Sequence, residues 1–162
     1  MVVLGTGEEK YSQFFLALQQ KYPTYVSAKI RYNEWLAHKI EGGADLFLMP
    51  SRFEPCGLNQ IYSLKYGTVP LVRATGGLDD TIQDFSESPA GTGFKFSRYL
   101  PEELLTTARR ALEVYQAPAR WRELVRNCMG KDFSWHRSAQ RYLELYQSLA
   151  ANQVQQPLRA KI

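Results

Sequence analysis

Short apolar runs alternate with longer segments of helical periodicity along most of this chain. The apolar runs predict strands at Val2–Leu4, Tyr25–Ile30, Leu46–Met49, Val69–Val72 and Phe94–Phe96. Apolar residues that recur every three or four positions predict helices at Glu8–Lys21, Asn33–Ile40, Asn59–Tyr66, Asp79–Phe85, Pro101–Tyr115, Ala119–Met129 and Trp135–Leu149. Strands that alternate with helices predict an α/β fold with a Rossmann-like, doubly wound parallel sheet and helices on both faces.

Boundary signals support several of these elements. Asn33 is suited to cap the start of the second helix, and Gly67 is suited to end the third. Pro101 fits the first position of the long fifth helix. Pro70 lacks an N–H group, so we expect it at an end or a bulge of its strand. Gly5-Thr6-Gly7 lacks the third glycine of a dinucleotide-binding motif and is interpreted as a strand-to-helix turn.

Length and composition limit the classes of protein to which this chain can belong. A chain of 162 residues is enough for one domain, which we expect to span residues 1–149, with a flexible tail at 150–162. The net charge of +4 is spread among acidic residues with no basic stripe, so nucleic-acid binding is not expected. No apolar run approaches the ~18 residues of a membrane span. Two cysteines without metal-like spacing predict no disulfide, no metal site and a reducing, cytoplasmic location.

Candidate chemistry gathers where the third strand ends. Glu54 follows that strand, which we expect to be buried, and precedes a Pro-Cys-Gly turn and a helix, which is where α/β proteins bind ligands. Amides at a helix start favour anionic oxygen, so the spacing predicts a site for a sugar joined to a phosphate. Two interpretations of Glu54 stay open: a ligand contact, or a loop carboxylate paired with Arg52. Cys56 is expected to be a small packed thiol rather than a nucleophile.

Other polar and aromatic positions also carry two interpretations each. Gly76-Gly77 follows the fourth strand and is either a simple turn or a place where the backbone approaches a ligand, with Asp79 as a candidate cap for the next helix. Tyr32 lies between a strand and a helix, where its ring either packs ordinarily or meets a base. The seam of Trp135, Tyr142 and Tyr146 on the last helix is expected to pack against another element.

Three motifs closely resemble bacterial glycogen synthases and plant starch synthases. They are Ser51-Arg52-Phe53-Glu54-Pro55-Cys56-Gly57-Leu58-Asn59-Gln60, Tyr66-Gly67-Thr68-Val69-Pro70 and Thr75-Gly76-Gly77-Leu78-Asp79-Asp80-Thr81. The family transfers glucose from ADP-glucose to the non-reducing end of an α-1,4-glucan, with retention, on a GT-B fold. Related transferases carry a second Glu where this chain has Tyr62, as the synthase branch does.

The resemblance implies a role for each matching residue. Glu54 would bind glucose hydroxyls and stabilise positive charge at the anomeric carbon. The backbone amides of Cys56, Gly57 and Leu58 would hold sugar hydroxyls, and those of Leu58 and Asn59 would face the distal phosphate. Tyr32 would lie by the adenine and Tyr62 by the ribose, while Gly76 and Gly77 would shape the loop behind the sugar. No metal or other cofactor is implied.

The resemblance also implies that parts of the family's site lie outside this chain. The match covers about the last third of a synthase, within the second of its two domains, so we expect the first βα unit and the N-terminal domain to be missing. The missing strand is central, so the remaining sheet would split or need a partner. We therefore expect the chain to be inactive alone. The resemblance also implies a location in the cytoplasm, or in the plastid stroma of a plant. The alternatives are a self-associating binding fragment and a transferase for another nucleotide sugar.

Overall fold

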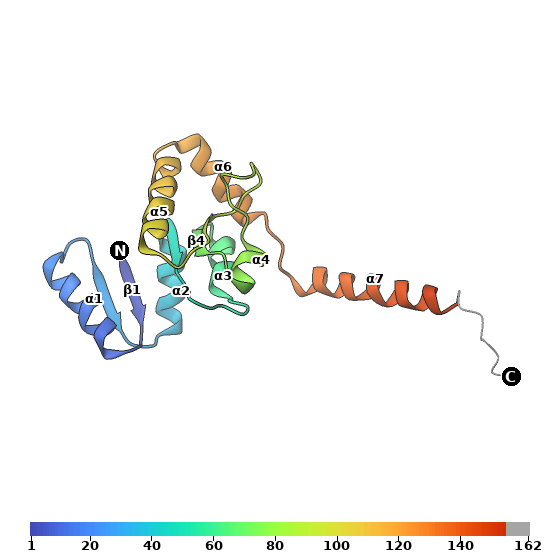
Figure 1. Ribbon diagram of the computed structural model, residues 1–162, viewed down its shortest axis with the longest axis horizontal. Helices are drawn as coiled ribbons and strands as arrows, with labels where there is room; N and C mark the ends of the chain where they lie inside the picture. The colour runs from blue at the N-terminus through green and yellow to red at the C-terminus, as the bar shows by residue number, and fades with distance from the viewer. Residues whose placement is uncertain (155–162) are drawn as a thin grey trace. The chain divides into compact units, whose positions relative to one another are not determined.

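The computed structural model describes residues 1–154, which form two compact units. The first unit is Met1–Gly130, and the second begins at Lys131. Figure 1 follows the chain through the first unit, from β1 to α6, and then along α7 in the second. The two units are described separately below.

Strands and helices alternate through the first unit as the hydrophobic pattern predicts. The strands are β1 (Val2–Gly5), β2 (Ser27–Ile30), β3 (Leu46–Met49), β4 (Val69–Arg73) and β5 (Phe94–Phe96). The helices are α1 (Glu9–Lys21), α2 (Glu34–Gly43), α3 (Asn59–Tyr66), α4 (Gly76–Thr81), α5 (Pro101–Tyr115) and α6 (Pro118–Met129). The predicted α/β class is confirmed, and most helix ends lie within two residues of their expected positions.

All strand pairs are parallel, but they form two sheets rather than one. β1 pairs with β2, while β3, β4 and β5 form a separate sheet in that order. Among the described residues, no strand pairs with the free edge of β1 or with that of β3. This is the split expected if the central strand of a doubly wound sheet is absent. Val2 and Leu48, one on each open strand, are both 50% exposed.

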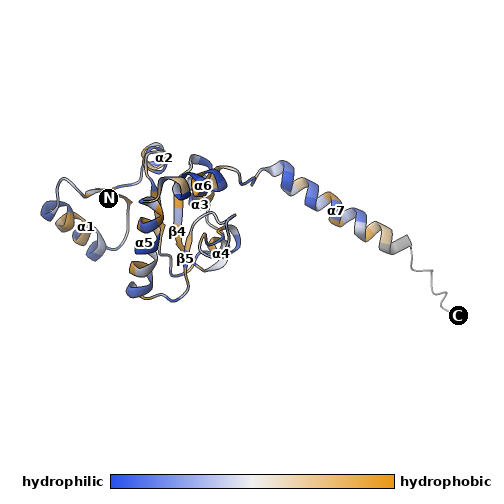
Figure 2. Cartoon of the chain, turned by 90° about the horizontal axis from the view of Figure 1, so that it is seen from above, coloured by the Kyte–Doolittle hydropathy of each residue, from blue (hydrophilic) through white to orange (hydrophobic). Residues whose placement is uncertain are grey.

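The hydrophobic core surrounds β4, the middle strand of the larger sheet. Val69, Pro70, Leu71 and Val72 are all buried, so both faces of this strand are covered. α3, α4, α5 and α6 all contact β4. Figure 2 shows β4 and β5 coloured hydrophobic beside helices that carry hydrophilic stretches. Pro70 is the second residue of β4, which agrees with its expected place near a strand end.

Two local signals in the sequence have the predicted geometry. The Asn33 side chain accepts a hydrogen bond of 2.9 Å from the amide of Leu36 and so caps α2. Gly67 follows α3 with φ of 81°, the left-handed conformation that glycine adopts most easily. These short-range signals therefore fix where two elements that flank the third strand begin and end.

Three expectations about the elements were wrong. β3 is only partly buried, because one of its edges has no neighbouring strand. α4 spans Gly76–Thr81 rather than Asp79–Phe85, and its N-cap is Thr75, because the amide of Leu78 already donates to the Thr75 carbonyl and closes a first turn before Asp79. α7 (Trp135–Val154) runs beyond Leu149. Residues 155–162 of the expected tail lie outside the described residues.

α7 is the only helix of the second unit within residues 131–154. The aromatic side chains of its predicted seam are exposed, Trp135 most strongly at 89%. The rings of Tyr142 and Tyr146 lie with their centroids 6.4 Å apart, which confirms that they share a helix face. The packing partner expected for this seam stays a prediction.

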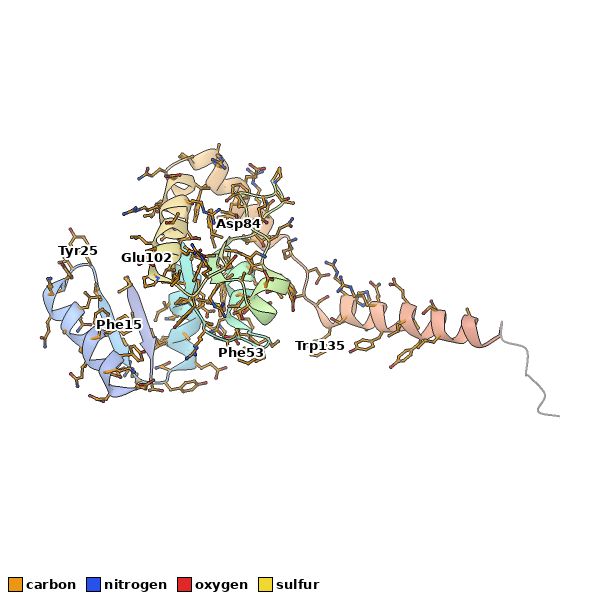
Figure 3. The ribbon with its side chains drawn as sticks, in the orientation of Figure 1. Phe15, Tyr25, Phe53, Asp84, Glu102 and Trp135 are labelled. Carbon is orange, nitrogen blue, oxygen red and sulfur yellow. The ribbon has the colours of Figure 1, made fainter. Side chains whose placement is uncertain are left out.

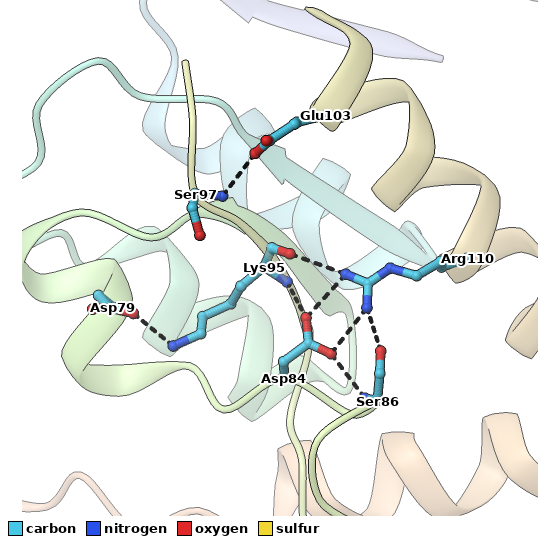
Figure 4. Close-up of polar contacts among 7 residues, drawn as sticks. All are labelled: Asp79, Asp84, Ser86, Lys95, Ser97, Glu103 and Arg110. Atoms are coloured by element: carbon cyan, nitrogen blue, oxygen red, sulfur yellow. Dashed lines mark hydrogen bonds and ion pairs between the residues drawn. The ribbon is translucent and has the colours of Figure 1, made fainter. Parts of the chain in front are cut away.

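A buried carboxylate fixes the loop between α4 and β5. Asp84 is 3% exposed and accepts hydrogen bonds from the amides of Ser86 (2.8 Å) and Lys95 (2.7 Å). The guanidinium of Arg110 on α5 lies 3.1 Å from the same carboxylate and also donates to Ser86 and to the Lys95 carbonyl. Burial alone would raise the pKa of Asp84, but these hydrogen bonds together lower it below its ordinary value. Figure 4 shows how this network joins the loop, β5 and α5.

We expect Asp84→Asn to lower the free energy of unfolding by about 1–3 kcal/mol at neutral pH, because the amide replaces one acceptor oxygen with a donor. A lowered folded-state pKa means that the carboxylate's stabilisation is present above pH 3.8 and is lost as the pH falls through the lower folded value. Urea unfolding of both proteins between neutral and acidic pH measures this, and the difference between them should shrink in acid.

Asp79→Asn is the matched control, since the Asp79 carboxylate also contacts Lys95, through an ion pair of 2.6 Å with its Nζ, but the Asp79 side chain is 51% exposed. An exposed pair contributes about 0–1 kcal/mol. If both variants lower the free energy of unfolding by the same amount, the burial of Asp84 does not determine how much its carboxylate stabilises the fold.

Candidate functional site

The candidate site lies in the loop that joins β3 to α3 and contains Glu54, which we call the Glu54 loop (residues 50–58). β3 and β4 are parallel, so this loop and the one that leads from β4 into α4 leave the same edge of the sheet. Figure 3 shows Phe53 in the Glu54 loop. The topology therefore brings Glu54 and the Gly76-Gly77 pair to one edge, although the sequence separates them widely.

Carbonyl groups of the Glu54 loop are held by the rest of the unit. Arg73, at the end of β4, donates from Nε to the carbonyl of Ser51 at 2.7 Å and from Nη2 to that of Arg52. The amide of Gly77 donates to the carbonyl of Glu54 at 3.1 Å. Arg73 was not among the residues predicted for the site, although its place at the end of an apolar strand was a usable signal.

The amides of the same loop are free. Within residues 1–154, the backbone N–H groups of Cys56, Gly57, Leu58 and Asn59 have no hydrogen-bond acceptor. Leu58 is the N-cap residue of α3, and no side chain caps this end of the helix. Unpaired amides at a helix start carry partial positive charge and bind anionic or hydroxyl oxygen. The loop thus has carbonyls held by the rest of the unit at residues 51, 52 and 54 and free amide donors at the residues that follow.

The first turn of α4 lies against the Glu54 loop with no room for side chains. A Cβ atom on Gly76 would come within 2.1 Å of the Glu54 carbonyl oxygen, and one on Gly77 within 1.8 Å of that of Cys56. Gly76 also has φ of 46°, in the left-handed region. Close backbone approach is therefore confirmed for this pair, but the observed neighbour is the Glu54 loop itself.

The carboxylate of Glu54 is available to a ligand. Glu54 is half-buried, and its contact within the described residues is a weak one of 3.5 Å with the hydroxyl of Ser51. No ion pair joins it to Arg52 in the described part of the chain, so the alternative interpretation of a paired loop carboxylate is not observed. A half-buried carboxylate beside free amides can accept hydrogen bonds from hydroxyl groups and face a developing positive charge.

The expectation for Cys56 was wrong. Its thiol is exposed rather than packed, and its sulfur lies 3.8 Å from the carbonyl oxygen of Gly57. The loop carbonyls are turned inward, which leaves this short side chain outside. Cys128, in contrast, is buried on α6 and lies 3.1 Å from the carbonyl of Thr92.

The two candidate tyrosines occupy different surroundings. Tyr62, one turn into α3, is 38% exposed, and its ring meets that of His38 edge-on with centroids 5.3 Å apart. Tyr32, after β2, is 81% exposed and has no hydrogen bond or ring contact within the described chain. The alternative of ordinary packing for Tyr32 is therefore not observed. The structure brings Glu54, Cys56, Gly57, Leu58, Asn59, Gly76 and Gly77 together and adds Tyr62 through α3.

Neither a metal site nor a membrane span is found in the described residues. No group of His, Cys, Asp or Glu side chains there has the arrangement to hold a metal ion. Across residues 1–154, every helix is too short or too polar to span a membrane.

Comparison with known proteins identifies relatives of this arrangement. Residues 1–127 match the family model for glycosyl transferases group 1. The chain is 57% identical over 150 residues to a glycogen synthase of Anaeromyxobacter dehalogenans, which covers 93% of this chain and 31% of that protein. It is 51% identical over 158 residues to a glycogen synthase of Koribacter versatilis, covering 97% and 32%.

A solved structure agrees with these sequence matches. The catalytic domain of starch synthase IV from Arabidopsis thaliana, bound to ADP and acarbose, superposes with a TM-score of 0.80 at 34% identity. The match covers 91% of this chain and 31% of that one. The chain thus spans about a third of the length of the relatives it matches.

We expect Gly77→Ala to destabilise the chain by about 2 kcal/mol or more, because the new methyl group would overlap the Cys56 carbonyl at 1.8 Å. The Glu54 loop must then move or α4 must unwind. Chemical denaturation measures the change in the free energy of unfolding.

Gly43→Ala is the matched control, because a Cβ atom there meets nothing within 4 Å and Gly43 lies in the last turn of α2. Alanine favours helix over glycine, so this variant should be neutral or slightly more stable. Equal stability for both variants would contradict the close packing of α4 against the loop.

Proposed function

The chain belongs to the group 1 glycosyl transferases, and we propose that it is the C-terminal part of a glycogen or starch synthase. The complete protein transfers glucose from ADP-glucose to the non-reducing end of an α-1,4-glucan with retention at the anomeric carbon. This chain supplies the glucose- and diphosphate-binding half of that site. Identity above 50% to glycogen synthases over most of its length supports the assignment.

The observation that carries the proposal is the row of free amides beside Glu54. The donors belong to four consecutive residues, Cys56 to Asn59, at the uncapped start of α3. In our proposal the first amides bind glucose hydroxyls, and those of Leu58 and Asn59 face the distal phosphate. Glu54 then binds the glucose and stabilises positive charge as the bond to the diphosphate breaks.

The nucleotide is assigned to the aromatic residues beyond the loop. We place Tyr62 by the ribose and Tyr32 by the adenine, since both rings have exposed surface. The starch synthase structure is bound to ADP and acarbose, which supports a nucleotide donor and a glucan acceptor here. Gly76 and Gly77 set the back of the sugar site by letting α4 lie against the Glu54 loop.

The remaining two thirds of a synthase supply the rest of the site. We propose that the cationic side chains that neutralise the leaving diphosphate, and the surface that binds the acceptor glucan, lie in the part of the relatives that this chain does not span. The isolated chain would therefore supply only part of the residues that bind the donor, and it would be inactive.

We expect the purified 162-residue chain to transfer no glucose from ADP-glucose to glycogen, whereas the complete protein that contains it does. In the complete protein, Glu54→Ala should lower kcat about a hundredfold or more, because it removes a group that stabilises transition-state charge. Radiolabelled glucose incorporated into glycogen measures both, and parallel reactions with UDP-glucose identify the nucleotide.

Glu113→Ala is the control, since Glu113 is an exposed carboxylate on α5, outside the site. It should keep wild-type rates. Turnover by the isolated chain would contradict its inactivity, and near-normal rates for Glu54→Ala would contradict the role of Glu54. A preference for UDP-glucose would assign the chain to a transferase for a different donor.

A second candidate function is self-association of the chain as a binding fragment. The unpaired edges of β1 and β3 favour it, because exposed strand edges pair with other chains. We expect light scattering of the purified chain to show a mass above 18.6 kDa that rises with concentration. A monomer at every concentration would contradict self-association, and it would leave the synthase assignment unaffected.

A further inference from the structure

Gln60 is a fully buried polar side chain to which the proposed function gives no role. It is the second residue of α3 and has 0% exposure. Its Nε2 lies 3.1 Å from the carbonyl oxygen of Cys56, 3.0 Å from that of Gly57 and 3.3 Å from the hydroxyl of Thr81. An amide nitrogen carries two protons, so these three acceptors share them. One side chain therefore holds two consecutive peptide groups of the Glu54 loop.

The planarity of the peptide group gives this contact a consequence for binding. In a trans peptide the carbonyl of one residue and the N–H of the next point in opposite directions, and no described peptide bond is cis. Gln60 holds the carbonyl of Cys56 and so directs the Gly57 amide away from the core. In the same way, its bond to the Gly57 carbonyl directs the Leu58 amide outward. These are two of the free amides of the candidate site.

A chain of hydrogen bonds extends this arrangement to α4. The hydroxyl of Thr81 accepts from Gln60 and donates to the carbonyl of Gly77 at 2.5 Å. The amide of Gly77 in turn donates to the carbonyl of Glu54. Both ends of the segment from Glu54 to Gly57 are thus tied to the first turn of α4, one directly and one through Gln60 and Thr81.

We propose that Gln60 is a positioning residue of the donor site, which orients the Gly57 and Leu58 amides toward the glucose and diphosphate. It touches no substrate and acts through the peptide groups that it holds. The identity of the ligand rests on the proposed function, whereas the orientation of the amides does not. Loss of the carboxamide frees two peptide groups to rotate, and an amide that rotates away from the donor no longer binds it.

The first test is made on the complete protein that contains this chain. Gln60→Met keeps the length of the side chain but removes its donors, and it should lower kcat/KM for ADP-glucose roughly tenfold to a hundredfold. KM for the glucan should stay within about twofold of wild type, because the acceptor is held elsewhere. A loss of folded protein alone would lower the rate and leave both KM values unchanged. Donor kinetics equal to wild type in Gln60→Met would overturn the proposal.

Matched variants separate positioning from stability. Gln19→Met is the control, because Gln19 also bonds to a backbone group, the Ala28 amide at 2.6 Å, but lies on α1. It should keep wild-type kinetics. If Gln60→Met does not fold, Thr81→Val and Thr81→Ser decide: the first removes the hydroxyl that joins Gln60 to α4, and the second keeps it. Only Thr81→Val should lower kcat/KM for ADP-glucose. Equal values of this constant in Thr81→Val and Thr81→Ser would overturn the proposal.

A second measurement needs no donor and so separates this inference from the proposed function. In ¹H–¹⁵N spectra of the 162-residue chain, Gln60→Met should shift the Gly57 and Leu58 amide resonances, and Gln19→Met should not. Unchanged Gly57 and Leu58 resonances would overturn the orienting role of Gln60. If those resonances shift but the wild-type complete protein transfers no glucose from ADP-glucose, the proposed function fails while the inference about Gln60 holds.

Discussion

The site depends on a backbone-to-backbone contact between two loops that follow neighbouring strands. Gly76 and Gly77 bring the first turn of α4 so close to the carbonyls of Glu54 and Cys56 that a Cβ atom on either glycine would overlap them. Because the loop is held there by its carbonyl oxygens, its amides are left to face outward. The free amides that we propose bind the diphosphate therefore depend on how the loop packs, as well as on the helix start behind it.

Buried and exposed polar groups have different roles as a result of the same packing. Asp84 and the Gln60 Nε2 group are buried and hydrogen-bonded to the loops that they position, and neither side chain has surface to offer a ligand. Glu54 and the amides from Cys56 to Asn59 are at least partly exposed and lack strong partners within the described residues. Buried polar groups must be hydrogen-bonded to be tolerated, so they serve to fix geometry, while the unpaired groups at the surface remain free to bind.

The division of the strands into two sheets shows which part of the candidate site is built by one sheet. β3, β4 and β5 form a sheet that positions the Glu54 loop without help from β1 and β2. The edges of β1 and β3 have no strand partner within the described residues, and the chain spans about a third of its relatives. The local geometry of the proposed sugar and diphosphate site thus lies within one sheet, whereas activity is proposed to need the rest of the protein.

The sequence encodes the order of elements, the helix ends at Asn33 and Gly67, and the motif around Glu54, because hydrophobic periodicity, capping and turn chemistry act between residues that are close along the chain. It misplaced the start of α4, predicted a packed Cys56 and missed Arg73 and Gln60 as supports of the loop. These features emerge only in the folded protein, because each depends on hydrogen bonds or close contacts between the β3–α3 and β4–α4 segments. Which face of the Glu54 loop turns inward is a property of that packing, and no local pattern encodes it.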